Sequence, residues 1–169
     1  MGRYLARMTK DRKIKFISHL DYMRSIQRAI RRAGLPISYS KGFNPHANLS
    51  FATPLAVGVA SESEYMDFTL DIDMDPDLIM QKLADFLPPG IKVVRVMEVD
   101  QKLPSLMSLV TAASYEITVV NINLNRLSGK DIDDFFDLPQ LEITKESKSG
   151  KRLVDIRPLI YSISLKSKI

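Results

Sequence analysis

Two histidines and a nearby aspartate are the residues of this chain that could carry acid–base or metal chemistry. The chain has 169 residues and two histidines, His19 and His46, and Asp21 lies close after the first. Two imidazoles and a carboxylate can form a metal site, and an imidazole can act as general acid or base. The alternative is structural: His19 fills the first turn of a helix, Asp21 stabilises that turn and His46 bonds within its own turn. We favour this alternative because the Asn-Pro-His spacing matches no known ligand pattern, and we expect no metal and no cofactor.

A row of arginines on one predicted helix is the strongest functional signal in the sequence. Ser18 is a good N-cap and Gly34 can end a helix in the left-handed conformation, which predicts a helix over 19–33. Apolar side chains recur every three or four residues and predict the buried stripe, which is Leu20, Met23, Ile26 or Gln27, Ile30 and Ala33. The opposite face then carries Arg24, Arg28, Arg31 and Arg32.

We expect this basic helix to bind RNA or another polyanion. No acidic residue lies between Tyr22 and Leu35 to pair with the arginines inside the helix. Guanidinium groups match phosphate oxygens in a bidentate geometry. The loop that follows the helix adds Lys41 and Phe43, and an aromatic ring there could stack on an unpaired base. The alternative is that the arginines form only a solvated helix face.

Charge is distributed unevenly along the chain. Residues 1–48 carry eleven basic and two acidic side chains, a net charge of +9, whereas residues 61–91 carry eight acidic side chains and one lysine, a net of −7. This segregation indicates either a surface that faces a polyanion, with a separate acidic flank, or two segments that neutralise each other across adjacent strands.

Composition excludes several classes of protein. The chain has no cysteine, so it can form neither disulfides nor thiolate metal sites, and it cannot hold an iron–sulfur cluster through cysteine. No apolar run approaches the roughly 20 residues of a membrane helix, and the N-terminus is too charged for a secretory signal. We therefore expect a globular cytoplasmic protein with no membrane partner, since 45% hydrophobic residues can build a core.

The predicted elements of residues 1–100 follow the order strand, helix, two strands, helix, strand. This is the order of the ferredoxin-like split βαβ sandwich, an α+β fold. We expect a four-stranded antiparallel sheet with both helices on one face. The predicted strands are 3–9, 49–52, 64–72 and 91–99, the predicted helices are 19–33 and 76–87, and 13–17 extends or pairs with the first strand.

The rest of the chain is predicted to start a second, incomplete ferredoxin-like unit. Residues 101–113 contain Pro104 and several serines and are expected to form a connector. Residues 114–169 then give strand, helix and further strands, with an extra strand in place of the final helix. The predicted strands are 114–120, 141–146, 152–156 and 159–165, and the predicted helix is 128–138.

Several strings of residues resemble the bacterial family named radical SAM-linked protein. They are Phe16-Ile17-Ser18-His19-Leu20-Asp21, Arg-Arg-Ala-Gly-Leu-Pro at 31–36, Tyr39-Ser40-Lys41-Gly42-Phe43-Asn44-Pro45-His46, Leu49-Ser50-Phe51-Ala52 with Pro54-Leu55 and Val57-Gly58, and Ser63-Glu64-Tyr65-Met66-Asp67. The resemblance covers roughly residues 3–158. It implies an uncharacterised protein that occurs beside a radical SAM enzyme or fused to its C-terminal end. The genes of that family often lie near those of an RNase E/G-type ribonuclease and a large-subunit ribosomal protein, so the resemblance also implies work on RNA or ribosomes.

Three functions follow from these observations. A radical SAM enzyme needs cysteines for its cluster, so this chain is expected to be a non-catalytic partner of the radical SAM enzyme encoded nearby, which binds RNA or presents a substrate through the basic helix. The first alternative is a metal-independent endoribonuclease that uses His46 or His19, by analogy with tandem ferredoxin-like CRISPR repeat-processing enzymes. The second is a protein–protein interaction module that binds through the apolar segment 53–60.

Overall fold

Strand β1 (Gly2–Lys10) lies at the centre of a four-stranded antiparallel sheet in the computed structural model of this chain, which describes residues 1–119, 129–147 and 150–166. The strand order is β2-β3-β1-β4, with β2 at Leu49–Phe51, β3 at Ser61–Leu70 and β4 at Ile91–Val99. Helix α1 (His19–Arg32) follows β1, and α2 (Pro76–Phe86) follows β3. This order confirms the predicted ferredoxin-like arrangement of an α+β fold.

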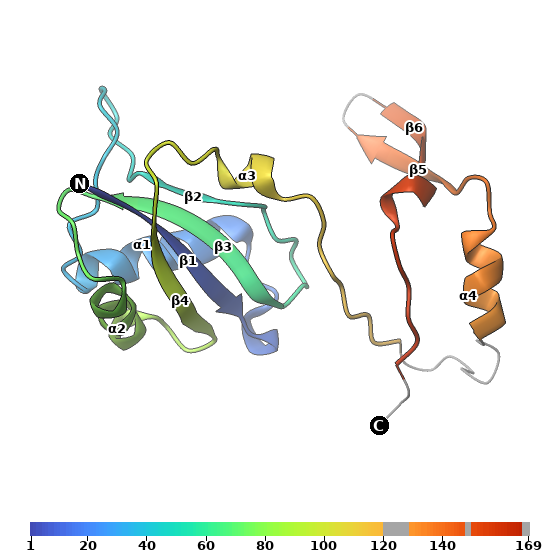
Figure 1. Cartoon of the computed structure of the whole chain (residues 1–169), viewed down its shortest axis with the longest axis horizontal. Coiled ribbons are helices and arrows are strands. Elements are labelled where there is room, and N and C mark those ends of the chain that lie inside the picture. The colour runs from blue at the N-terminus through green and yellow to red at the C-terminus, as the bar shows by residue number, and fades with distance from the viewer. Residues whose placement is uncertain (120–128, 148–149, 167–169) are drawn as a thin grey trace. The chain divides into compact units, whose positions relative to one another are not determined.

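Both helices pack on the same face of this sheet, as predicted. In β1 the residues alternate between buried and half-buried, and the buried apolar side chains are Tyr4, Ala6 and Met8. They form one apolar cluster with Ile26 of α1 and Ile79 of α2. The helices contact each other, and Figure 1 shows them together at one side of the sheet. A single core between one sheet face and two helices therefore stabilises this unit.

Helix α1 begins and ends as its sequence predicts. The Asp21 backbone N–H donates to Ser18 Oγ at 3.1 Å, and the Ser18 hydroxyl donates back to Asp21 Oδ2 at 2.8 Å. At the other end Gly34 has a φ of 64°, its N–H donates to Arg31 O, and Leu35 N–H donates to Ile30 O. These two bonds form a Schellman motif, which requires the left-handed conformation at the glycine.

The buried stripe of α1 differs from the prediction by a rotation about the helix axis. Ile26, Ile30 and Ala33 are buried as expected, but Leu20 is exposed, and Tyr22 and Ala29 take the remaining buried positions. Tyr22 was overlooked because its hydroxyl is polar. In the structure that hydroxyl donates to Thr9 O at 3.0 Å, which satisfies the polar group while the ring packs in the core.

The strand expected at 13–17 is wrong. Residues Arg12–Ile14 form a 3₁₀ turn, and Asp11 caps it by accepting from Lys13 N at 2.8 Å. Lys10 holds the next residues in place, because its buried Nζ donates to the carbonyl oxygens of Lys15 and Ile17 at 3.1 and 3.0 Å. The segment therefore turns back under the start of α1.

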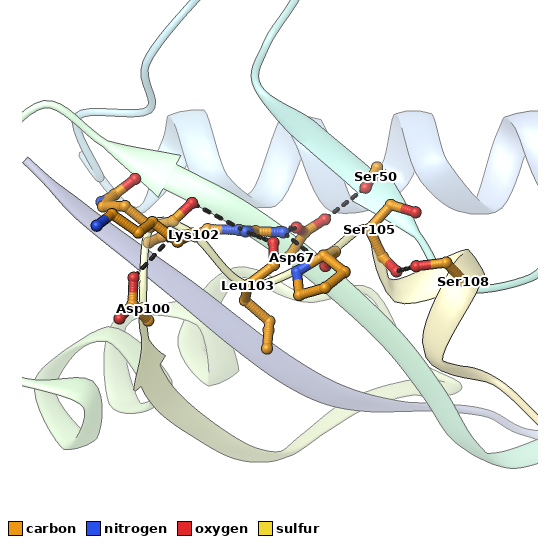
Figure 2. Close-up of polar contacts among 10 residues, drawn as sticks. Ser50, Asp67, Asp100, Lys102, Leu103, Ser105 and Ser108 are labelled. Carbon is orange, nitrogen blue, oxygen red and sulfur yellow. Dashed lines mark hydrogen bonds and ion pairs between the residues drawn. The ribbon is translucent and has the colours of Figure 1, made fainter.

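The second face of the sheet is partly covered by the segment after β4. The Arg3 guanidinium pairs with Asp67 of β3 and also donates to Leu103 O. Asp67 in turn accepts from Ser50 of β2, and Figure 2 shows this carboxylate between Ser50 and the segment. Residues 101–113, expected to be a connector, thus lie in the first compact unit, 1–114, together with the short helix α3 (Leu106–Leu109).

The second compact unit, 115–169, contains a helix and a β-hairpin in its described part. Helix α4 (Gly129–Phe136) matches the predicted helix, whose first residue Ser128 is outside the described residues. Strands β5 (Glu142–Ser147) and β6 (Gly150–Asp155) pair antiparallel. The strands expected at 114–120 and 159–165 are wrong for the described residues 114–119 and 160–165, and Arg157–Leu159 form a 3₁₀ turn. Residue 120 lies outside the description.

None of the helices in the described part of the chain is long and apolar enough to cross a membrane.

Candidate nucleic-acid interface

The four arginines of α1 are exposed, as the periodicity of the helix predicts. Their exposure follows from the position of the buried stripe, because Ile26 and Ile30 pack on the opposite side of the helix in the core. None of the four forms an ion pair with the acidic segment 61–91 among the described residues. The ion pairs that join the two segments are Arg3 with Asp67 and the N-terminal amino group with Asp73. Mutual neutralisation therefore does not account for the helix arginines.

Three of these arginines line a surface cavity of about 430 Å³, which we call the arginine cavity. Its lining residues are Ser25, Arg28, Arg31, Arg32 and Pro88. Positions 25, 28 and 32 lie three and four residues apart and so share one side of α1. Pro88 comes from the chain just after α2, which returns beside the C-terminal half of α1. The cavity is thus lined by three arginine side chains of one helix and by a proline, mainly through their carbon atoms, and it brings three positive charges to one part of the surface.

The guanidinium groups of the three arginines that line the cavity have different partners. Arg32 Nη2 donates to Phe86 O, at the end of α2, at 2.7 Å, which ties the ends of the two helices together. Arg28 Nη2 makes only a long contact of 3.5 Å to Ser25 Oγ. The structure records no hydrogen bond or ion pair for the Arg31 side chain among the described residues. Arg28 and Arg31 therefore keep most of their donors for an anion.

Arg24 differs from the other three arginines, because it does not line the cavity. Its Nη1 lies 3.4 Å from Asp21 Oδ1 in an exposed pair three residues apart. The absence of acidic residues between Tyr22 and Leu35 therefore does not leave Arg24 without a partner, because Asp21 lies just before Tyr22. The helix arginines that line the cavity are therefore Arg28, Arg31 and Arg32.

Lys41 and Phe43 lie on a separate loop rather than in the arginine cavity. The loop closes where Tyr39 bridges Ala47 and where the Ser40 N–H donates to His46 O at 2.8 Å. Figure 1 shows it projecting from the sheet before β2. Phe43 is 100% exposed, so its ring packs against nothing in the protein and is free to stack on a ligand.

The contacts of the three candidate catalytic residues are typical of structural roles. His19 packs its ring edge against Phe51, with 5.2 Å between ring centroids, and its Nδ1 is buried without a hydrogen-bond partner. The backbone N–H of His46 donates to Ser40 Oγ at 2.9 Å, and its side chain is exposed. Asp21 is occupied by Ser18 and Arg24. Neither imidazole is hydrogen-bonded to the other or to Asp21 in the described part of the chain.

Metal binding finds no support from the grouping of side chains. Across the described residues, no three His, Asp or Glu side chains come together in a way that could hold a metal ion.

A buried polar group under the start of α1 was not foreseen from the sequence. Lys10 of β1 and Glu64 of β3 are both buried on the helix side of the sheet. Burial lowers the pKa of Lys10, and the Glu64 carboxylate opposes this shift. Burial, with the Glu64 charge, raises the pKa of Tyr22. The alternation of side chains along β1 and β3 places both charged residues on the core face, and this alternation can be seen in the sequence.

Ser25 and Pro88 were also missed as parts of the site. Ser25 was detectable, because it lies three residues before Arg28 on the same helix face. Pro88 was not detectable, because its place beside α1 depends on how α2 packs.

A family of bacterial proteins matches nearly the whole chain. The family described as "Uncharacterized protein conserved in bacteria (DUF2344)" matches residues 3–169. No curated protein matches the chain. The match agrees with the bacterial and uncharacterised part of the resemblance drawn from the sequence, and the partnership with a radical SAM enzyme stays a prediction.

Proposed function

This chain belongs to the bacterial family DUF2344, and we propose that it is a non-catalytic protein that binds RNA phosphates through its arginine cavity. The observation that carries the proposal is the gathering of Arg28, Arg31 and Arg32 around one cavity of about 430 Å³. The projecting loop supplies Lys41 and Phe43 as further contacts to the same ligand.

The chemistry of the arginine cavity favours a phosphate ligand. A guanidinium group offers two parallel donors that match two phosphate oxygens, and it keeps its charge at every physiological pH. Three arginines on neighbouring positions of one helix, with no ion pair among the described residues, form a positive patch that attracts an anion. An RNA backbone supplies anions at regular intervals, and the exposed Phe43 ring adds a platform for an unpaired base.

We further propose that the protein is a cytoplasmic accessory protein of the radical SAM enzyme encoded nearby. The resemblance described above supports this partnership, and the absence of cysteine makes the chain dependent on another protein for any iron–sulfur chemistry. An exposed apolar area is available for a protein contact: Phe16 is 73% and Val57 is 59% exposed. The Gly58 N–H donates to Lys15 O at 2.8 Å, so segment 53–60 is tied to the residues before α1.

Direct binding to a labelled single-stranded RNA tests the RNA proposal. The double variant Arg28→Ala, Arg31→Ala should lose affinity, because these are the cavity guanidinium groups without strong protein partners. Arg24→Ala is the matched control, since it removes an arginine of the same helix that lies outside the cavity. Equal loss in the control and the double variant would mean that net charge, not the cavity, decides binding.

Copurification with the nearby radical SAM enzyme tests the partnership. Val57→Asp should abolish retention of the enzyme on the tagged chain, because it places a charge in the exposed apolar area. Val94→Asp is the control, since Val94 is exposed on β4 and lies outside that area. Retention of the enzyme by Val57→Asp would contradict the proposed contact, and no retention by the unmodified chain would contradict the partnership.

A further inference from the structure

A row of three side chains crosses the sheet on the face opposite the helices. The pairing of β1 with β3 places Arg7 opposite Tyr65, and the pairing of β1 with β4 places Arg7 opposite Arg95. We call Tyr65, Arg7 and Arg95 the sheet row. Arg7 belongs to the half-buried set of β1, so it points away from the core that Ala6 and Met8 enter. Residues directly opposite on paired strands share a face, so all three lie on the face opposite α1 and α2.

The charges of the sheet row are unfavourable for the protein alone. Arg7 and Arg95 are like charges directly opposite each other, which destabilises a strand pair. Neither has an ion pair among the described residues, and the recorded hydrogen bond of the Arg7 guanidinium is the 3.3 Å contact of its Nε to Glu62 O. Lys92, opposite Thr9, adds an exposed positive charge at the same end of the sheet. An anion would relieve this repulsion.

Arg3 lies on the same face of the sheet and, unlike Arg7, has a carboxylate partner. It lies four residues before Arg7 in β1, pairs with Asp67 and donates to the segment that covers this part of the sheet. The face is therefore divided: the Arg3 half is paired and covered, and the Arg7 half is basic and unpaired. The carboxylate that could have neutralised the row, Asp67, is already occupied by Arg3 and Ser50.

Tyr65 gives the sheet row an aromatic platform. Its side chain is 40% exposed although it lies in the middle of β3, a central strand of the sheet. An aromatic ring on the open face of a four-stranded sheet, flanked by guanidinium groups, can stack an unpaired base while the cations bind its phosphate. The register shifts between Arg7 and Met8, so Val94 has no partner in β1 and forms a small bulge beside Arg95.

We propose that the sheet row is a second contact site for single-stranded nucleic acid, at which Tyr65 stacks on one unpaired base and Arg7 and Arg95 bind the adjacent phosphate. The inference rests on the proposed function in one respect, that the ligand is RNA. It adds a requirement for unpaired bases, which the arginine cavity alone does not impose. The row therefore selects single strands over duplexes.

The test compares one RNA sequence as a single strand and as a duplex, by fluorescence anisotropy with the full chain. Tyr65→Ala should weaken single-strand binding about 5- to 150-fold and leave duplex binding unchanged, because one stacked base is lost. Tyr65→Phe should bind like the unmodified chain, since it keeps the ring. Tyr115→Ala is the control, because Tyr115 is exposed in the second unit, outside the row.

The outcomes separate this proposal from the arginine cavity. If the Arg28, Arg31 variant loses binding and Tyr65→Ala does not, the sheet row is wrong and the cavity stands. If Tyr65→Ala loses single-strand binding and the cavity variant does not, the sheet row stands and the cavity is wrong. Should Tyr65→Ala fail to fold, the exposed Arg95→Ala decides, because unchanged single-strand affinity in that variant would overturn the proposal.

Discussion

Replacing Arg28 and Arg31 by alanine together should flatten the salt dependence of RNA binding. Each phosphate that a protein neutralises on a single strand contributes about −0.7 to the slope of log K against log salt concentration, because condensed counterions are released. The three arginines of the arginine cavity therefore contribute about −2.1 to the slope, to which the proposed contacts of Lys41 and the sheet row add. The double variant loses two of these contacts, so its slope should be about 1.4 less steep than that of the unmodified chain.

These slopes correspond to an easily measured difference in affinity. Between about 50 and about 200 mM salt, the loss of affinity should be about 7-fold smaller for the double variant than for the unmodified chain. The assay is fluorescence anisotropy of an end-labelled single-stranded RNA of about twelve nucleotides, titrated at a series of salt concentrations. The slope is more informative than one affinity, because it counts the phosphate contacts that were lost.

Two controls make the result interpretable. Arg24→Ala should leave the slope unchanged, because its guanidinium pairs with Asp21 outside the cavity. Thermal unfolding of the double variant should match that of the unmodified chain within about 0.5 kcal/mol, since exposed side chains contribute little to stability. Equal slopes for the double variant and the unmodified chain would refute the cavity as a phosphate site, and loss of folding would show that the arginines are structural.

Two further predictions concern the charged residues that the sheet buries. Asp67→Ala should lower the free energy of unfolding, measured in urea, by about 3 kcal/mol, because the Arg3 guanidinium loses its carboxylate partner. The control Asp73→Ala removes an exposed ion pair and should lower it by less than about 1 kcal/mol. Equal effects of the two substitutions would contradict the role of the Arg3–Asp67 pair. Burial lowers the pKa of Lys10, so the unfolded chain binds this proton more tightly than the folded protein does, and stability should rise with pH from the lowered folded pKa towards the ordinary value of 10.5. The Lys10→Met variant should lack this rise. Tyr22, whose pKa is raised, makes the folded protein less stable only above about pH 10. Below that pH, parallel stability profiles of the variant and the unmodified chain would contradict the role given to Lys10.

Features set by neighbouring residues could be predicted from the sequence alone. The ends of α1 depend on the Ser18 cap and on the left-handed Gly34, and both lie within a few residues of the bonds they make. The alternation in β1 and the Asp75-Pro76 start of α2 are equally local. The order of these elements was enough to predict the ferredoxin-like sheet, because few topologies bury one face of that set.

Several features depended on which strands pair and in which register. Arg7 and Arg95 are 88 positions apart, and the bulge at Val94 sets which residue of β4 comes opposite Arg7. Arg3 and Asp67 likewise meet only because β1 and β3 are adjacent. A shift by one residue would move each of these side chains to the other face of the sheet, and no short segment of sequence specifies the register.

For the candidate site, too, some features could be predicted from the sequence and others depended on tertiary structure. The exposure of Arg28, Arg31 and Arg32 followed from helical periodicity, because the apolar side chains of the same helix must face the core. The cavity itself required the end of α2, since Pro88 closes its side and Phe86 O accepts from Arg32. Sequence alone thus determined which residues face solvent on one helix. Only packing between distant segments decided which of them lie together, because each such contact depends on where another element ends in space.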